Sequence, residues 1–490
     1  MKTSTRINQE VIVAAGLSRA DARRLAVMKK QGLVIKLAPT VYTTNKNDTP
    51  ENIVTRNLFY ILGELYSGAL LSHRSAFEYK PADGGHIFLT YRYTKKVRLQ
   101  SFTIHLIEGP LALDEDYPFM GGLRVSCQAR AYLENLQNAY RCGSVSKCLT
   151  REEIEERLER VLQTNGESAL NELRDTARSI AERLDMRTEF ERLDAIIGAL
   201  LSTKPAGVLT SASAQARAIG EPFDSNRVNL FNILLAALNN CEFENFPEPY
   251  TSDAAYRNFA FFESYFSNYI EGTEFELDDA RQIVETQTPL PSRNADSHDV
   301  LGTYYIVSNR KEMSIVPSSA DQLIDILQNR HQILMSARVN SAPGLFKMQN
   351  NRAGETHFVD YNQVRGTLRK GFEVYSALRH PFARAVFMLF MISEVHPFND
   401  GNGRMSRIMM NAELTAAGQS KVIIPNVFRA DYLGGLRQLS RRSNPDVLIR
   451  SMMRVRLFSS HLQGEDFNVM RDYLEQCNAF KNDDEDVLRF

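Results

Sequence analysis

One stretch of twelve residues constrains the fold more than any other part of the sequence. It reads His-Pro-Phe-Asn-Asp-Gly-Asn-Gly-Arg-Met-Ser-Arg and covers residues 396–407. Residues 378–395 before it predict an apolar helix that ends ahead of Pro397, because the residue before a proline is disfavoured in a helix. Arg404–Ala417 predicts a second helix that ends near Gly418. We therefore expect a loop between two buried helices, with its glycines leading into a helix N-terminus.

The residues of this loop are typical of a phosphate site. Gly401, Asn402 and Gly403 allow backbone N–H groups to turn toward phosphate oxygens, and the dipole of the following helix attracts anions. Arg404 and Arg407 are three residues apart, so they lie on one face of that helix and can hold two phosphates. The stretch therefore predicts an anion site at a helix N-terminus.

Two more side chains of the stretch add chemistry to this site. Asp400 supplies a hard carboxylate, suited to one bond of an octahedral Mg²⁺ that bridges phosphates. His396 is able to be neutral near pH 7 and to take a proton from an incoming hydroxyl. A base, a metal ligand, an amide cradle and two arginines together predict a phosphoryl- or nucleotidyl-transfer site. The sequence has no competing phosphate-loop lysine motif of the form GxxxxGK.

At every defined position the stretch matches the Fic signature, His-x-Phe-x-Asp/Glu-Gly-Asn-Gly-Arg-x-x-Arg. Residues 205–460, about half the chain, resemble a bacterial Fic protein. The resemblance implies a mainly α fold, with an all-helical Fic core and a short β-hairpin flap. It also implies a protein adenylyltransferase, a nucleotidyltransferase that moves AMP from ATP to a Ser, Thr or Tyr hydroxyl of a target protein and releases pyrophosphate.

The resemblance also implies a role for each matched position. His396 is the general base, Asp400 is the Mg²⁺ ligand, and Phe398 is an apolar anchor that points into the core. The nucleotide phosphates are bound by Gly401, Asn402, Gly403, Arg404 and Arg407, of which Arg404 also acts in the transfer step. Relatives that resemble the Doc kinase carry lysine at the position of Gly403 and bind the nucleotide the other way round. Gly403 therefore favours AMP transfer over phosphate transfer.

An upstream motif, Ser267-Asn-Tyr-Ile-Glu271-Gly272, resembles the inhibitory helix of the family. We expect Glu271 to pair with Arg407 in place of the terminal phosphate, because a carboxylate and a phosphate compete for the same guanidinium. Ser267 belongs to the same inhibitory motif. The alternative is a solvated glutamate near a helix end, with Gly272 capping that helix.

The flap is expected within residues 343–361, where Gly354 can turn a hairpin and residues 357–359 would form its second strand. In the family, such a strand pairs with the target segment by β-augmentation. Asn411 and Tyr432 lie where relatives contact the nucleoside, although packing alone would explain each of them.

The N-terminal part of the chain differs in charge from the remainder. Residues 1–100 contain 16 basic and 7 acidic residues, a net of +9, whereas the whole chain has a formal charge of −1. A helix-like run at Val11–Ala15, a helix capped by Ser18 and two strand-like segments predict a winged helix-turn-helix. The predicted DNA contacts on the second helix are Arg19, Arg23, Arg24, Lys29 and Lys30.

This stretch resembles the N-terminal winged helix of AbiEi-type antitoxins, which suggests a toxin–antitoxin context. The wing corresponds to Gly32, Leu33, Val34, Lys36 and Val41–Tyr42. Two alternatives are a solvated basic helix that binds nothing and a protein-docking module.

The sequence predicts four regions. They are a winged helix at 1–95, an α+β and helical middle region at 96–205, a Fic domain with its inhibitory helix at 206–465, and an acidic C-terminal tail at 466–490. Glu and Arg at helical spacing predict a helix pair at 150–200. Five scattered cysteines without a CxxC pair are typical of a reduced, cytoplasmic protein. No apolar run is long enough to predict a membrane span.

These observations support two functional hypotheses. The first is an autoinhibited AMP transferase that uses ATP and Mg²⁺, modifies a protein target and carries a DNA-binding head; this hypothesis is compatible with a homodimer. The second is a DNA-binding transcriptional regulator whose silent Fic site senses nucleotide. The intact His396 favours the first, because a pure sensor needs no base.

Overall fold

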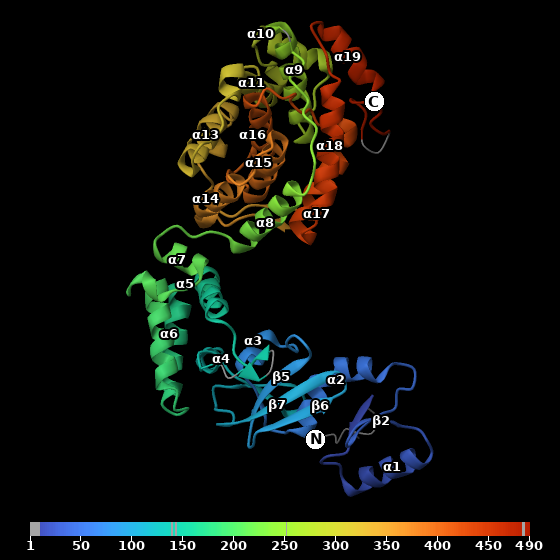
Figure 1. The fold of residues 1–490 in the computed structure, drawn as a ribbon, viewed down its shortest axis with the longest axis vertical. Helices are drawn as coiled ribbons and strands as arrows, with labels where there is room; N and C mark the ends of the chain where they lie inside the picture. Colours follow the sequence, from blue (N-terminus) through green and yellow to red (C-terminus); the bar gives the residue numbers. More distant parts are fainter. Residues whose placement is uncertain (1–9, 139–140, 143–144, 251, 483–485) are drawn as a thin grey trace. The chain divides into compact units, whose positions relative to one another are not determined.

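The computed structural model describes residues 10–138, 141–142, 145–250, 252–482 and 486–490. The chain divides into two compact units, Met1–Ile219 and Gly220–Phe490 (Figure 1). The predicted mainly α architecture is confirmed, with an additional α+β region in the first unit. Among the described residues, no helix combines the length and the apolar character needed to cross a membrane.

The first unit begins with a small three-stranded sheet and two helices. The elements are β1 (Val11–Val13), α1 (Arg19–Lys30), β2 (Ile35–Ala38), β3 (Val41–Thr43) and α2 (Pro50–Leu65). The sheet order is β1-β3-β2, with β2 and β3 forming an antiparallel hairpin. As predicted, Ser18 caps α1, and its side chain accepts a hydrogen bond from the backbone N–H of Asp21 at 3.1 Å.

The prediction of a helix at Val11–Ala15 is wrong. Val11–Val13 is a fully buried strand that pairs with Val41–Thr43. Three consecutive β-branched residues favour a strand, and pairing with β3 satisfies their backbone. The region therefore has a wing-like hairpin, but residues 10–30 contain one helix and not a helix-turn-helix pair. The predicted winged helix also includes residues 1–9, which lie outside the described ranges.

A six-stranded sheet forms the centre of the first unit. Its strands are β4 (Leu70–Leu71), β5 (His86–Tyr91), β6 (Lys95–Leu99), β7 (Phe102–Glu108), β8 (Tyr117–Pro118) and β9 (Arg124–Val125), in the order β6-β7-β5-β4-β9-β8. β5 pairs with β7 in parallel, whereas β6 and β7 form an antiparallel hairpin. The limit at residue 95 that was predicted for the winged helix falls inside this sheet.

Helices complete the first unit. They are α3 (His73–Glu78), α4 (Gln128–Asn135), α5 (Arg151–Ala181), α6 (Arg187–Leu200) and α7 (Ala212–Ala218), with a small β10–β11 ladder (Arg141–Cys142 and Val145–Ser146) and 3-10 turns at Met120–Gly122 and Ala206–Val208. The predicted helix pair at 150–200 is confirmed. Thr150 starts α5 with a capping box that includes Glu153. α7 packs on α5 and α6, so this unit extends beyond the predicted limit at residue 205.

The second unit is a helical body with one hairpin. Its helices are α8 (Ser225–Asn239), α9 (Asp253–Ile270), α10 (Leu277–Thr286), α11 (Asn294–Val307), α12 (Arg310–Met313), α13 (Ala320–Leu334), α14 (Val364–Tyr375), α15 (Pro381–Val395), α16 (Asn402–Ala416), α17 (Arg429–Arg442), α18 (Asp446–Ser460) and α19 (Phe467–Gln476). The hairpin strands are β12 (Arg352–Ala353) and β13 (Thr356–His357), and 3-10 turns lie at Pro291–Arg293, Val339–Ser341, Tyr361–Gln363 and Asn426–Phe428.

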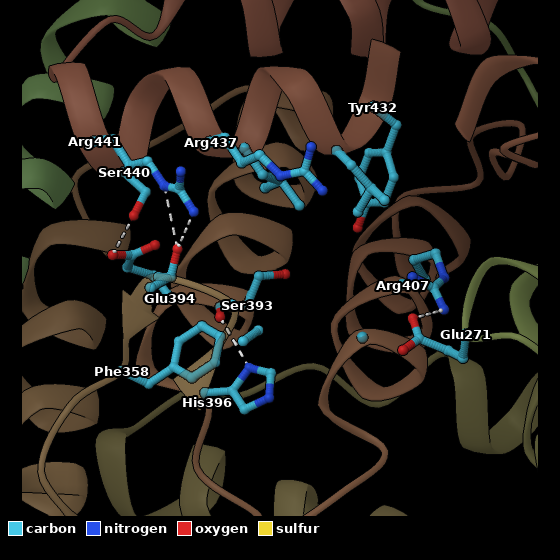
Figure 2. A pocket seen from close by; sticks show the side chains of 16 residues that line it. Glu271, Phe358, Ser393, Glu394, His396, Arg407, Tyr432, Arg437, Ser440 and Arg441 are labelled. Atoms are coloured by element: carbon cyan, nitrogen blue, oxygen red, sulfur yellow. Dashed lines mark hydrogen bonds and ion pairs between the residues drawn. The ribbon is translucent and has the colours of Figure 1, made fainter. Parts of the chain in front are cut away.

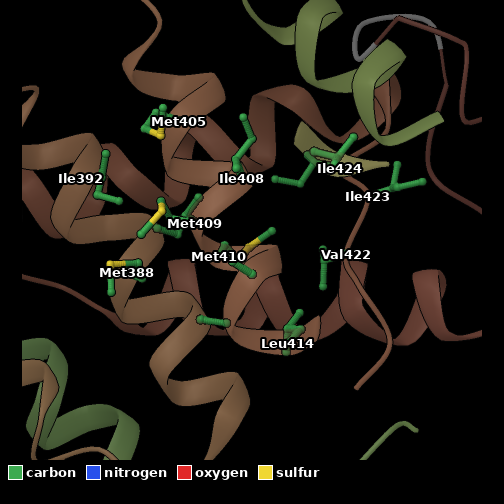
Figure 3. Close-up of a cluster of buried hydrophobic side chains, with 14 of the residues drawn as sticks. Met388, Ile392, Met405, Ile408, Met409, Met410, Leu414, Val422, Ile423 and Ile424 are labelled. Atoms are coloured by element: carbon green, nitrogen blue, oxygen red, sulfur yellow. The ribbon is translucent and has the colours of Figure 1, made fainter. Parts of the chain in front are cut away.

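α15 and α16 form the centre of this unit (Figure 1). Met388 and Ile392 of α15 are completely buried, and Met405, Ile408 and Met409 of α16 are at most 1% exposed (Figure 3). Burial of each such side chain stabilises the fold by roughly 1.5–3 kcal/mol. The loop between the two helices is therefore fixed at both ends by the core.

The C-terminal region is not the separate acidic tail that was predicted. Asp466 caps α19, and Met470 and Leu474 are fully buried in the core of the second unit. Leu488 is 4% exposed and belongs to the same core. The apolar residues between the charged ones supply this packing, and the described residues from 466 onward are part of the helical body.

Candidate active site

His396 is the C-cap residue of α15. It has a left-handed backbone conformation, with φ 50°, and its backbone N–H donates to the carbonyl of Ile392 at 3.0 Å. Its ring Nδ1 lies 3.3 Å from the carbonyl oxygen of Ser393, which can only accept, so Nδ1 carries the proton. Nε2 is thereby left with a free lone pair. Burial lowers the pKa of His396 to about 4, so the ring is neutral at pH 7.

The loop after His396 is held by its own side chains and by α13. Asn402 Oδ1 accepts from the backbone N–H of Phe398 and its Nδ2 donates to the Phe398 carbonyl, both at 2.9 Å. The ring of Phe398 is fully buried and stacks on His331 with 3.7 Å between centroids, which confirms the predicted anchor. His331 Nδ1 accepts from the N–H of Gly344, so its Nε2 donates to the Asp400 carbonyl at 3.0 Å.

Gly401 and Gly403 form the start of α16. Gly401 precedes the helix with φ 74°, a conformation that strongly favours glycine. A Cβ on Gly403 would lie 2.1 Å from Oε1 of Glu271. The carboxylate of Glu271 therefore lies directly against the first turn of α16, where the helix dipole favours an anion.

Glu271 and Arg407 are in direct contact, as the sequence predicted (Figure 2). Arg407 Nη2 donates to Glu271 Oε1 at 2.7 Å and to the carbonyl of Ser267 at 2.8 Å, and its Nε donates to Ser267 Oγ at 2.9 Å. The Arg407 side chain is 6% exposed. Gly272, with φ 86°, ends the α9 segment. The end of α9 and its C-cap residue Glu271 thus supply a carbonyl, a hydroxyl and a carboxylate to one guanidinium.

Arg404 points to other partners. Its Nη1 lies 3.1 Å from Asp299 Oδ1 of α11 and 3.4 Å from Asn268 Oδ1 of α9, and its Nε has no hydrogen-bond partner among the described residues. Asp299 is buried and also accepts a bidentate pair from Arg338 at 2.6–2.9 Å. Arg404 is therefore neutralised by a buried carboxylate in this state.

Asp400 presents its side chain to solvent. The carboxylate is 54% exposed, Oδ1 accepts from the N–H of Gly401 at 2.7 Å, and Arg404 Nη2 lies 3.9 Å away. Among the described residues, no group of three or more His, Cys, Asp or Glu side chains is arranged to hold a metal. A single exposed carboxylate fits a Mg²⁺ that takes its remaining ligands from phosphates and water.

The predicted hairpin is present beside His396. Gly354 makes the turn with φ 57°, and the strands pair Arg352 with His357 and Ala353 with Thr356. The second strand is therefore Thr356–His357 and not the predicted 357–359. Phe358 leaves the ladder to stack on the His396 ring, with 3.7 Å between centroids and 5° between planes.

A cavity of about 500 Å³ joins these parts, a volume typical of small-molecule sites (Figure 2). The hairpin and α17 form its walls, and the other lining residues include Glu271, His396, Gly403 and Arg407. Four of the residues predicted to bind the phosphates or Mg²⁺, all within the described chain, do not line it: Asp400, Gly401, Asn402 and Arg404. Ser267 of the predicted inhibitory motif does not line it either.

The two predicted nucleoside positions differ in their surroundings. Tyr432 is 1% exposed and lines the cavity. Asn411 lies outside it, and its amide is used in packing: Nδ2 donates to Glu263 and to the Val422 carbonyl, and Oδ1 accepts from the Val422 N–H, all at 2.8 Å.

Sequence reasoning missed several residues that hold the site. They are His331, Asp299, Asn268, Lys347, Arg227 and Glu394. Lys347 is 2% exposed, and its backbone N–H donates to the Pro397 carbonyl at 2.9 Å. Burial lowers the pKa of the Lys347 side chain to about 8. All six come from outside the twelve-residue stretch. Asn268 lies within the upstream motif that begins at Ser267, which was a signal that could have pointed to it, whereas no local pattern pointed to the other five.

Comparisons with known proteins bear on the segment that holds this site. Residues 322–414 match the model of the Fic/DOC family. The chain is 30% identical over 173 residues to the protein adenylyltransferase Fic of Drosophila willistoni, and 29% identical over 173 residues to that of Drosophila melanogaster. The first match covers 34% of this chain and 34% of the relative, so the chain spans about a third of the length of the curated relatives it matches.

A solved structure of Fic-1 from C. elegans is 16% identical and aligns with a TM-score of 0.35, covering 67% of this chain and 98% of that one. Residues 322–414, which contain the loop, His396 and both arginines, are similar in sequence to the Fic/DOC family.

Proposed function

We propose that this chain is a protein adenylyltransferase, which transfers AMP from ATP to a hydroxyl side chain of a target protein. The observation that carries the proposal is the neutral His396, with its Nε2 lone pair free, in one cavity with Arg407 and the first turn of α16. The sequence similarity to named protein adenylyltransferases supports the same reaction class.

The chemistry follows from these positions. His396 Nε2 takes the proton of the target hydroxyl, whose oxygen forms a bond to the α-phosphorus of ATP as the bond to pyrophosphate breaks. Arg407 and the N–H groups of the α16 first turn stabilise the phosphate charge. Asp400 would hold Mg²⁺, which supplies charge neutralisation on the phosphates when it is bound. Arg404 would assist once it leaves Asp299.

We further propose that Glu271 keeps this site inactive. Its carboxylate lies on both Arg407 and the α16 N-terminus, so it occupies the place that a terminal phosphate would take. ATP that binds against this carboxylate would have its α-phosphate displaced from the line of attack. Ser267 fixes α9 to the same arginine and so belongs to the inhibitory contact.

The test compares incorporation of labelled AMP from ATP, with Mg²⁺ and cell lysate, by wild type, Glu271→Gly and Glu271→Gly/His396→Ala. We expect strong labelling of target and of the chain itself in the first variant and none in the double variant. Labelling that survives in the double variant would contradict the assigned reaction. Nucleotide binding without any labelling would favour the alternative of a silent nucleotide sensor.

A second proposal, DNA binding by the first unit, rests on α1. Arg19, Arg23, Arg24, Lys29 and Lys30 are all exposed on this helix, which lies next to the β2–β3 hairpin. Lys29 also lies 3.9 Å from the centroid of the Tyr42 ring. The full chain should bind duplex DNA with an affinity that falls steeply with salt, because bound phosphates release counterions.

The double variant Arg23→Glu/Arg24→Glu should weaken DNA binding for all sequences. Identical affinity of this variant and the wild type at low salt would exclude α1 as the DNA contact and favour a protein-docking role.

A further inference from the structure

Arg227, in the first turn of α8, contacts two parts of the second unit at once. Its Nη1 lies 2.9 Å from Oε1 of Glu394, and its Nη2 donates to the carbonyl of His357 in β13. Glu394 lies on α15, two residues before His396. One guanidinium therefore joins the main chain of the hairpin to the helix that ends in the candidate base.

The hairpin segment is also attached at its two ends, because Asn351 Nδ2 donates to the Phe398 carbonyl at 3.0 Å and Val359 is fully buried in the core. The hairpin strands are two residues long, and a hairpin of that size is marginally stable by itself. Arg441 donates to Thr356 Oγ1 at 2.9 Å, but the Arg441 side chain is 43% exposed, and exposed contacts of this kind contribute little. Phe358 contributes its stack on His396. Among the described residues, Arg227 is the side chain that donates directly to the β13 backbone.

Arg227 and Glu394 form a mostly buried ion pair. The Glu394 side chain is 5% exposed and that of Arg227 is 17% exposed. Burial raises the pKa of Glu394, and the charge of Arg227 opposes this rise. Ser440 Oγ donates to the same carboxylate oxygen at 3.0 Å. Removal of Arg227 leaves the buried Glu394 carboxylate with Ser440 but without its cation, so the charge of Glu394 depends on Arg227.

We propose that Arg227 and Glu394 are positioning residues, which hold the hairpin at the distance from His396 at which a target hydroxyl reaches Nε2. The inference rests on the proposed function, in which the target segment lies along the hairpin. The His357 carbonyl already accepts from Arg227, so that segment pairs with other groups of the hairpin. A misplacement of about 1 Å lowers the rate of such a reaction by ~10²-fold.

The first experiment measures the hairpin itself and needs no activity. Hydrogen exchange of residues 349–361 is compared in wild type, Arg227→Gln, Glu394→Gln and the double Gln variant, with Tm and ATP affinity measured in parallel. We expect exchange to be faster by about tenfold in each single variant. The double variant should exchange no faster than Arg227→Gln, because both changes remove the same ion pair. In the double variant neither charge of the pair remains. It therefore controls for a folding defect that an unpaired charge could cause in the single variants.

Arg441→Gln is the matched control, because Arg441 also contacts the hairpin but does not contact Glu394. Its effect on exchange should be smaller and should add to that of Glu394→Gln. Unchanged exchange in Arg227→Gln and Glu394→Gln would overturn the proposal.

The second experiment measures AMP transfer in the Glu271→Gly background. Arg227→Gln and Glu394→Gln should each lower kcat for the protein target by about tenfold or more, while ATP affinity stays close to that of the parent; the double Gln variant, which leaves no unpaired charge, should show the same loss of kcat. Faster exchange with unchanged kcat would overturn the positioning role. Absence of AMP transfer in Glu271→Gly alone would refute the proposed function, and the exchange data would still decide whether the pair fixes the hairpin.

Discussion

Glu271 Oε1 lies 2.7 Å from Arg407 Nη2, although 136 residues separate the two in the chain. The same carboxylate lies against Gly403, at the first turn of α16. One acidic side chain therefore fills both parts of the anion site, the guanidinium and the helix N-terminus. This arrangement leads to predictions on activity, on pH dependence and on stability.

Substitution Glu271→Gly should raise AMP incorporation by ~10²-fold, because it frees Arg407 and lets the phosphates align. Arg407→Ala should not have this effect, since it removes the phosphate anchor together with the partner of Glu271. Labelled AMP incorporation by the two variants and wild type checks this. An equal rate for wild type and Glu271→Gly would remove Glu271 from the mechanism.

Substitution His396→Ala should abolish AMP transfer and leave ATP binding largely intact, because Arg407 and the α16 N-terminus remain. Rate and affinity are measured separately, by labelling and by calorimetry, in the Glu271→Gly background. A wild-type rate in the alanine variant would show that another group takes the proton.

The rate of AMP transfer should stay flat with pH down to about pH 5. Burial lowers the pKa of His396 to about 4, from an ordinary value near 6.5, so the ring stays neutral across this range. A histidine with an ordinary pKa would instead lose about tenfold in rate per pH unit below 6.5. A pH–rate profile of Glu271→Gly at saturating ATP distinguishes the two, and a break near pH 6.5 would contradict the expectation.

Substitution Gly403→Ala should displace Glu271 from Arg407, because the new Cβ would lie 2.1 Å from Glu271 Oε1. The free energy of unfolding should fall by about 1–3 kcal/mol, the usual cost of losing a charged hydrogen bond. In the Glu271→Gly background the same substitution should cost much less. Urea unfolding of wild type, Gly403→Ala, Glu271→Gly and the double variant gives the coupling free energy between residues 403 and 271. An equal loss of stability from Gly403→Ala in both backgrounds would argue against a contact between the new Cβ and Glu271.

Lys421→Met should lower the free energy of unfolding by ~3–5 kcal/mol, because it leaves a buried carboxylate without its cation. Lys421 Nζ lies 2.7 Å from Glu263 Oε2, and the two side chains are 1% and 6% exposed. The double variant Lys421→Met/Glu263→Gln should recover part of the loss. Thermal unfolding of the single and the double variant measures both effects. If Lys421→Met is as stable as wild type, the ion pair makes no net contribution to the free energy of unfolding.

Local patterns predicted the secondary structure around the site well. The residue before Pro397 and the glycines that follow it marked the end of α15 and the start of α16, and both helices are present. The Ser18 cap of α1 was predicted for the same reason, since a cap is a contact between near neighbours in sequence. Gly354 likewise marked the hairpin turn.

The predictions that were wrong depended on distant partners. Val11–Val13 is a strand because β3, 30 residues further along, pairs with it, and the apolar run by itself was compatible with a helix. The region beyond residue 466 is packed because Met470 and Leu474 reach the core of the second unit, which its acidic composition did not reveal.

The sequence by itself determined the chemistry-bearing loop, its two flanking helices and the residue types that an anion site needs, because these depend on neighbours within a few positions. The resemblance of the upstream motif also implied the pairing of Glu271 with Arg407. Only the tertiary structure decided the other partners of these residues. Arg404 lies against Asp299, and the hairpin is held through Arg227 and Glu394. Such contacts join helices far apart in sequence, and their geometry is set by how the helices pack around α15 and α16 rather than by any local pattern.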